Sequence, residues 1–152
     1  MSPVKQLARH LDRTVTGPMW HGPSLNDVLD GVTPEQATAH GVPGAHSIWE
    51  IVLHVTAWAE IARARLKGER LGDPPVDEDW PRVPGSAAAD WERTLGRLRT
   101  SHRELASDVE QFDESRLDDK IDGLAYSPRV LLQGVIEHGV YHGGQIALLR
   151  KI

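Results

Sequence analysis

One stretch decides the fold of this chain: SPRVLLQGVIEHGVYHGGQIALLRK, residues 127–151. Ser127 followed by Pro128 is typical of a helix start, because the serine hydroxyl caps free amides and proline fits the first helical position. Beyond this start, residues at steps of three and four share one helix face. They are Leu131, Val135, His138, His142, Ile146 and Leu149. The stretch predicts a long amphipathic helix with two histidines at the centre of its buried stripe.

The rest of the sequence predicts three more long helices, over residues 4–15, 48–67 and 86–111. The second of them opens with the capping box Ser47-Ile48-Trp49-Glu50, and all three carry apolar residues at helical spacing. One or two short helices are expected between residues 24 and 39. No segment alternates apolar and polar residues as a half-buried strand does. We therefore predict an all-α four-helix bundle with short extra helices in the first connection.

The connection between the second and third long helices differs in composition from both. Residues 71–85 are rich in proline and acidic residues and show little periodicity. Such a composition is typical of an exposed connection. We expect this segment to separate two helical hairpins.

Length, composition and charge limit the function classes. The chain has 152 residues, 39% of them hydrophobic, which fits a single domain over residues 1–152. Its net charge of −5 argues against nucleic acid as a partner. No apolar run approaches the roughly 18–20 residues that span a membrane, and residues 1–5 lack the apolar stretch of a signal peptide. We expect a cytoplasmic protein without a membrane partner.

The chemistry is expected at the histidines, because the chain contains no cysteine and any metal must be held by histidine or carboxylate. His138 and His142 lie one turn apart on a buried face. Each can be a core imidazole bonded to a neighbour, or the pair can bind one ion. His54 lies beside Ile51 and Trp58, at the edge of the buried stripe of the second long helix. If the two helices are neighbours, three imidazoles meet and leave at least one coordination position open.

Three segments of the sequence resemble the DinB and YfiT-like proteins: WHGPSL (20–25), HSIWEIVLHVTAW (46–58) and EHGVYHGGQI (137–146). The resemblance implies a four-helix bundle that holds a divalent metal on His54, His138 and His142, and it implies a homodimer. Some members of this family are thiol-dependent transferases or isomerases that use mycothiol or bacillithiol. Others are described as metal-dependent hydrolases. The resemblance does not select among these activities.

Several other residues are candidates for lesser roles. His46 and His21 could line the mouth of a cavity, although a solvated position is the alternative for each. Glu50 is either the capping-box residue or a general base, and the cap is the favoured role. Gln145 suits a contact to a metal-binding histidine better than direct metal binding. Trp58 is expected to wall a substrate pocket, whereas we predict that the remaining histidines lie on the surface: His10, His40 and His102.

The leading hypothesis is a metal-dependent enzyme, either a hydrolase or a thiol-dependent transferase. A divalent ion, such as zinc, nickel or another first-row transition metal, lowers the pKa of a bound water or thiol. The substrate is a small molecule, and any thiolate comes from a low-molecular-weight thiol, since the chain has no cysteine. The alternative is a non-catalytic, metal-stabilised protein that acts in binding or stress response. No nucleotide-binding motif and no Gly-x-Ser-x-Gly elbow is present, so no organic cofactor is expected.

Overall fold

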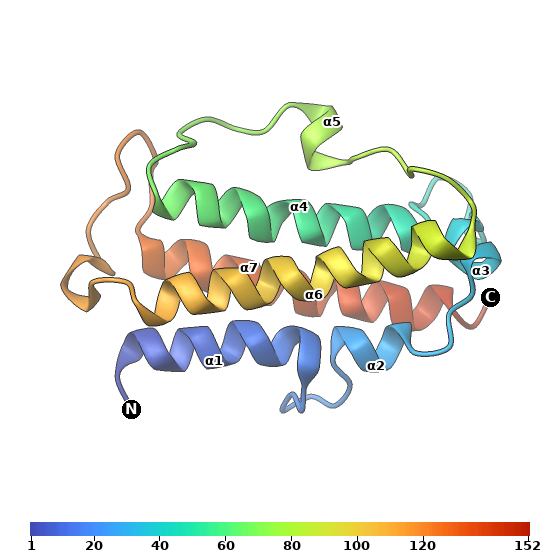
Figure 1. Cartoon of the computed structure of the whole chain (residues 1–152), viewed down its shortest axis with the longest axis horizontal. Coiled ribbons are helices and arrows are strands. Elements are labelled where there is room, and N and C mark those ends of the chain that lie inside the picture. Colours follow the sequence, from blue (N-terminus) through green and yellow to red (C-terminus); the bar gives the residue numbers. More distant parts are fainter.

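Four long helices lie side by side in the computed structural model, which describes residues 1–152 (Figure 1). They are α1 (Pro3–Thr16), α4 (Ile48–Leu66), α6 (Ala88–Glu110) and α7 (Pro128–Leu149). Helices α1 and α4 each pack against both α6 and α7, so α1 and α4 occupy opposite corners of the bundle. The structure contains no strand, and the predicted all-α bundle is confirmed. None of its helices is long and apolar enough to cross a membrane.

Short helices occupy the connections between the long ones. They are α2 (Leu25–Leu29), α3 (Pro34–Thr38), α5 (Val76–Asp79) and the 3-10 helix η1 (Glu114–Arg116). Two of them lie in the first connection, as expected. Ser24, Thr33 and Ser47 form capping boxes at the starts of α2, α3 and α4, which satisfies backbone amides that the helices leave free. The cap of α7 is Ser127, whose hydroxyl accepts a hydrogen bond from the amide of Val130.

The segment between α4 and α6 is only partly the exposed connection that its composition predicts. Most of its residues are exposed, but it forms α5, which packs against α4 (Figure 1). Asp79 and Trp80, at the end of α5, are partly buried. The indole of Trp58 fixes this end by donating a hydrogen bond to Asp79 Oδ1 at 2.7 Å. The proline and acidic residues of this segment account for its exposed part. The end of α5 is nevertheless attached to the bundle, through the contact between Asp79 and Trp58.

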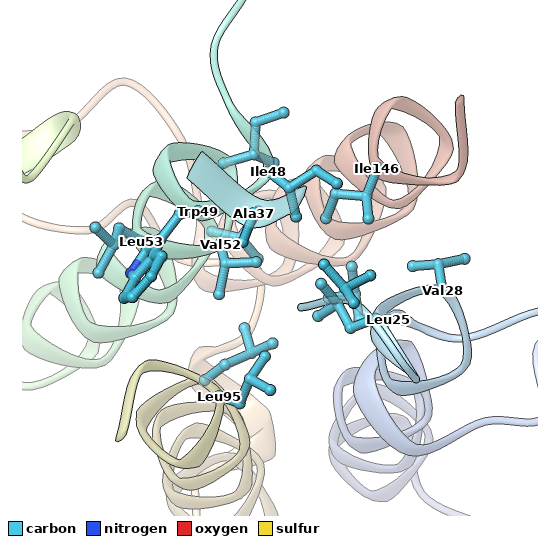
Figure 2. Close-up of a cluster of buried hydrophobic side chains, with 14 of the residues drawn as sticks. Leu25, Val28, Ala37, Ile48, Trp49, Val52, Leu53, Leu95 and Ile146 are labelled. Carbon is cyan, nitrogen blue, oxygen red and sulfur yellow. The ribbon is translucent and has the colours of Figure 1, made fainter. Parts of the chain in front are cut away.

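The core consists of two apolar clusters, one toward each end of the bundle. The first contains 16 buried residues, and Figure 2 shows side chains of α2, α3, α4, α6 and α7 meeting in it, among them Leu25, Trp49 and Ile146. The second contains 14 buried residues, including Leu11 and Leu132. Between the two clusters, α6 and α7 each carry polar side chains that are buried or partly buried. These are Ser101 and His102 on α6, and His138 and His142 on α7. The bundle therefore has a polar layer across its middle.

Close packing of α1 against α7 beside this layer depends on one glycine. A Cβ added at Gly139 would lie 2.6 Å from Cγ2 of Thr14, a buried residue of α1. Gly144, on the same helix, is exposed and would meet nothing within 4 Å. Gly139 therefore has no room for a side chain, whereas Gly144, on the same helix, has.

We predict that alanine affects stability differently at these two glycines. Gly144→Ala should stabilise the fold by up to about 1 kcal/mol through helix propensity. Gly139→Ala should be about 1–3 kcal/mol less stable than Gly144→Ala, because the added methyl overpacks the contact with Thr14. Urea unfolding measures both free energies. Thr14→Ser, which removes the clashing methyl group, should rescue Gly139→Ala, and failure of this rescue would contradict the packing explanation.

Candidate metal centre

Three imidazoles from two helices converge in the polar layer. His54 lies on α4, and His138 and His142 lie one turn apart on α7. Nε2 of His138 is 2.9 Å from Nε2 of His54 and 3.1 Å from Nε2 of His142. One nitrogen of each ring lies within 4.8 Å of the other two. The structure therefore brings together the three residues that the sequence singled out, across 84 residues of chain between His54 and His138.

The outer nitrogens of two of these rings are held by oxygen atoms. Nδ1 of His54 lies 2.6 Å from the carbonyl oxygen of Asp79, and Nδ1 of His142 lies 2.6 Å from Oε1 of Gln145. Carbonyl oxygens only accept hydrogen bonds, so each Nδ1 must carry the proton and donate. Each neutral ring then presents the lone pair of Nε2 to the centre of the cluster.

Burial keeps the three rings neutral. Burial, followed by the proximity of His142 and His54, lowers the pKa of His138 from 6.5 to about 3. Burial is also the largest cause that lowers the pKa values of His54 and His142. Neutral imidazole is the form that binds metals, so the cluster is in its metal-binding form at neutral pH.

The donor set fits a small cation. With the Nε2 lone pairs of His54 and His142 both directed at His138, a proton on His138 Nε2 can satisfy only one of them. A divalent ion between the three nitrogens satisfies all three. Nδ1 of His138 is buried and has no hydrogen-bond partner among the protein atoms. Three neutral imidazoles suit zinc, nickel, copper, cobalt or iron(II).

The end of α5 covers the cluster from the solvent side. The Trp80 ring stacks on His54, with centroids 3.8 Å apart, and on His46, with centroids 3.6 Å apart. Asp79 Oδ1 lies 3.2 Å from His54 Nδ1 and also accepts the hydrogen bond from Trp58. The contacts that fix the orientation of the His54 ring therefore come from the end of α5.

Two cavities adjoin the cluster. One, of about 520 Å³, is lined by His54, His138, Trp58, Asp79 and Arg65 among other residues. The other, of about 760 Å³, is lined by His46, Trp80, His142 and Gln145 together with apolar residues near the end of α7. Trp58 lines the first cavity, and its contact with a substrate stays a prediction. The three-histidine cluster thus has space beside it on two sides.

The structure also places the other residues for which the sequence suggested roles near the site. Glu50 is the capping residue, and its carboxylate also lies beside His40 and His46. His46 is about half exposed and lines the second cavity, as one of its two interpretations predicted. His21 is exposed and lines a separate hollow away from the three histidines. The contact between Gln145 and His142 is the one predicted for it.

The prediction of a surface position is wrong for His102. This residue is 1% exposed in the middle of α6, where Nδ1 donates to the carbonyl oxygen of Leu98 at 3.0 Å and Nε2 has no protein partner. His10 and His40 are exposed, as predicted. His102 lies between Leu98 and Leu105 at helical steps, so the helical phase could have placed it in the core.

Sequence reasoning also missed Asp79, Trp80 and Arg65. The first two lie in a segment whose composition indicates solvent, and Arg65 belongs to a residue type that is rarely buried. The aromatic ring at position 80 was the one available signal for the docked end of α5. For Arg65 the available signal was its helical phase, because it follows Trp58 and Ala62 at steps of four and three.

The fold and the site define a class of protein: a four-helix bundle with an internal cluster of three histidines. The family model of the DinB superfamily matches residues 20–146, and the chain belongs to this superfamily. The match spans all three histidines and most of α7, and it confirms the resemblance seen in the three sequence segments. No curated protein and no solved structure matches the chain.

The burial of His102 predicts how the metal-free protein responds to acid. Burial lowers the pKa of His102 below 6.5, whereas the hydrogen bond to Leu98 raises it by less. Below pH 6.5 the unfolded chain therefore binds a proton at this residue that the folded chain does not, so stability falls as the pH falls. His102→Leu should reduce this slope by up to about 1.4 kcal/mol per pH unit. Urea unfolding of chelator-treated protein between pH 7 and pH 5 measures it, and an unchanged slope contradicts the assignment.

Proposed function

We propose that this DinB superfamily protein binds a divalent first-row transition metal through His54, His138 and His142. The observation that carries the proposal is the convergence of three Nε2 atoms, two of which must present lone pairs to one point. The family assignment supports it, because the matched region contains all three residues.

We further propose that the protein is a metal-dependent enzyme acting on a small molecule. Three protein ligands leave coordination open, and a cavity adjoins the cluster on each side. Both features favour catalysis over the alternative of a purely structural metal in a binding or stress-response protein. A divalent ion held there supplies Lewis acidity and lowers the pKa of a water or thiol that reaches it.

The residues of the chain have separate roles in this proposal. Asp79 and Gln145 keep His54 and His142 in the Nδ1-protonated form and fix their rings. The Trp58 ring lies beside His138 and the Trp80 ring stacks on His54, so both shape the walls of the adjoining cavities. Asp79 also lines the first cavity, where its carboxylate is placed to accept a proton from a ligand beside His54. The two candidate reactions are the ones that the family resemblance implies, hydrolysis and transfer to a thiol. Because the chain has no cysteine, that thiol would be a low-molecular-weight cosubstrate.

We predict that His138→Ala and His142→Ala each abolish tight binding of a divalent metal. The variants should remain helical, because the two apolar clusters of the core are intact. Elemental analysis of untagged protein measures the metal, and circular dichroism measures the helix content. His10→Ala, an exposed histidine on α1, is the matched control and should keep the wild-type metal content. Full metal content in either α7 variant removes that histidine from the ligand set.

His54→Ala gives a sharper result, because it leaves two imidazoles on a single helix. In the wild type the metal joins α4 to α7 and stabilises the fold by about 2.7 kcal/mol at a free concentration of 100 times its dissociation constant. A chelator should therefore lower the melting temperature of the wild type, and this shift should shrink in His54→Ala. An equal shift in both proteins contradicts the three-histidine site.

Activity should follow metal content in the same set of proteins. Two probe reactions are suitable. One is hydrolysis of a simple aryl ester, and the other is transfer of the aryl group of an activated aryl chloride to the thiol of L-cysteine, with release of chloride and a proton. A reaction that stops on chelation, returns with zinc and is missing in His138→Ala supports an enzyme. A fully metal-loaded protein that turns over neither probe favours the non-catalytic alternative.

We also propose that the protein is a homodimer, on the basis of the family resemblance. Several large apolar side chains of α7 are exposed, including Tyr141 and Leu148, which are 63% and 67% exposed. Sedimentation velocity at micromolar concentration should give twice the chain mass of 16.8 kDa. A species of the chain mass under these conditions contradicts the dimer.

A further inference from the structure

Arg65 is the buried cation in the wall of the cavity beside His54 and His138. Its side chain is 3% exposed, although it lies in the last turn of α4. One terminal nitrogen donates to the hydroxyl of Tyr126 and the other to the carbonyl oxygen of Gly72 at 3.0 Å. Its Nε is buried and has no hydrogen-bond partner. The hydrogen-bond acceptors of this guanidinium are therefore neutral, and they leave one donor unsatisfied.

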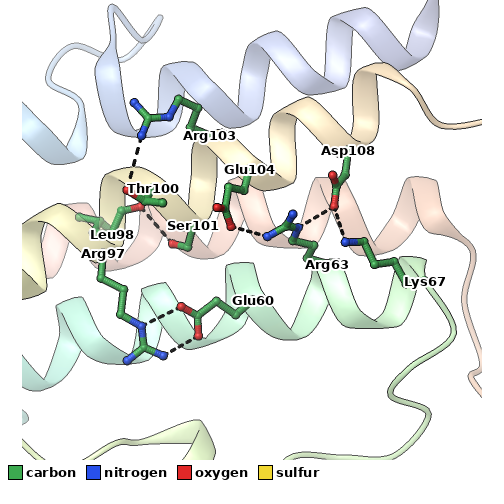
Figure 3. A network of polar contacts seen from close by, with 10 residues as sticks. All are labelled: Glu60, Arg63, Lys67, Arg97, Leu98, Thr100, Ser101, Arg103, Glu104 and Asp108. Carbon is green, nitrogen blue, oxygen red and sulfur yellow. Dashed lines mark hydrogen bonds and ion pairs between the residues drawn. The ribbon is translucent and has the colours of Figure 1, made fainter.

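The positive charge of Arg65 also lacks a close anionic partner. Its one carboxylate partner, Asp73, lies 3.7 Å away and is fully exposed. The arginines on the outer seam of α4 and α6 are paired far better (Figure 3). There Arg63 Nε donates to Asp108 at 2.6 Å, and Arg97 donates two hydrogen bonds to Glu60 at 2.8 and 2.6 Å. The buried arginine thus has the weaker anionic partner, the reverse of what burial of a charge requires.

Arg65 and the histidines lie at opposite ends of the cavity. The guanidinium carbon is 5.4 Å from the Trp58 ring centroid, and the Trp58 ring is 6.0 Å from that of His138. Positions 54 and 65 are separated by about 16 Å of helix axis, and side chains on a helix lean toward its N-terminus, which brings Arg65 back over Trp58. The indole therefore lies between the cation and the imidazoles.

The space between these ends suits a small amphipathic molecule. The cavity volume of about 520 Å³ is within the range of ligand sites. Val130, Leu131 and Val135 of α7 form an apolar part of its wall beside the Trp58 ring, and the carboxylates of Asp73 and Asp79 line it as well. A molecule that lies along this cavity meets a cation, then apolar surface, then the imidazoles of His54 and His138.

We propose that this cavity binds small organic carboxylates, with the carboxylate on Arg65 and the reacting group directed to His54 and His138. The inference rests on the proposed function and adds the substrate class. A bound carboxylate replaces the long contact to exposed Asp73 with direct hydrogen bonds, for which the planar guanidinium is well shaped. Trp58 contacts the apolar middle of the ligand. Arg65 is in this sense the residue that selects acids over neutral analogues.

A purely structural role for Arg65 predicts something different. Through Gly72 and Tyr126 it could simply attach two loops to the end of α4. Removing such a clamp lowers the melting temperature but does not change the preference between an acid and a neutral molecule of the same length. The preference is therefore the property to measure.

The experiment is calorimetric titration of zinc-loaded protein with mercaptohexanoate and with mercaptohexanol. The two probes share the thiol and the carbon chain, so the ratio of their affinities isolates the carboxylate end. The wild type should bind the acid about tenfold more tightly or better, as expected for hydrogen bonds to a charged group. Arg65→Gln should bring the ratio close to one, and Arg65→Lys should keep only part of it, because the charge remains while the planar fork is lost.

Two controls separate this inference from its alternatives. Arg63→Gln removes an arginine of the same helix that faces the outer seam, and it should leave the ratio unchanged. Equal affinity of the wild type for both probes overturns the inference, whether or not the Arg65 variants fold. If zinc does not bind at all, the proposed function fails instead, and hexanoate against hexanol, which carry no thiol, still tests Arg65 in the metal-free protein.

Discussion

The meeting of three imidazole nitrogens in the middle of an apolar bundle is the constraint on which the rest of the structure depends. Polar rings cost free energy in such a place unless each nitrogen has a partner. Two apolar clusters, one on each side, hold α4 and α7 at the spacing that lets His54 reach His138 and His142. Most of the apolar packing of the bundle therefore lies on either side of a polar middle layer.

The hydrogen-bond partners that orient the histidine rings come from different parts of the chain. His142 is fixed by Gln145, three residues further on the same helix, so its partner is local. His54 is fixed by the backbone carbonyl of Asp79, 25 residues away, on a segment that is otherwise exposed. The docked end of α5 is consequently part of the site, since without it one ring loses both the acceptor for Nδ1 and the stacking of Trp80.

Charge is distributed unevenly between the surface and the site. On the seam between α4 and α6, arginines and carboxylates are paired at short distances in a network that solvent reaches (Figure 3). Inside the first cavity the balance is incomplete, because buried Arg65 has only a distant, exposed carboxylate. Surface pairs of this kind contribute little to stability, whereas an under-paired buried cation favours an anionic ligand.

The sequence by itself determined the helical class, the starts of most helices and the stripe that places His138 and His142 one turn apart. These features depend on local spacing and on capping side chains, which are visible in one stretch of chain. Only the tertiary structure decided that α4 lies beside α7, that Asp79 and Trp80 return to the site, and which groups pack against buried Arg65 and His102. The reason is physical: such contacts join residues that are mostly far apart in the sequence, and the partners of a buried polar side chain come largely from other elements, which no local pattern specifies.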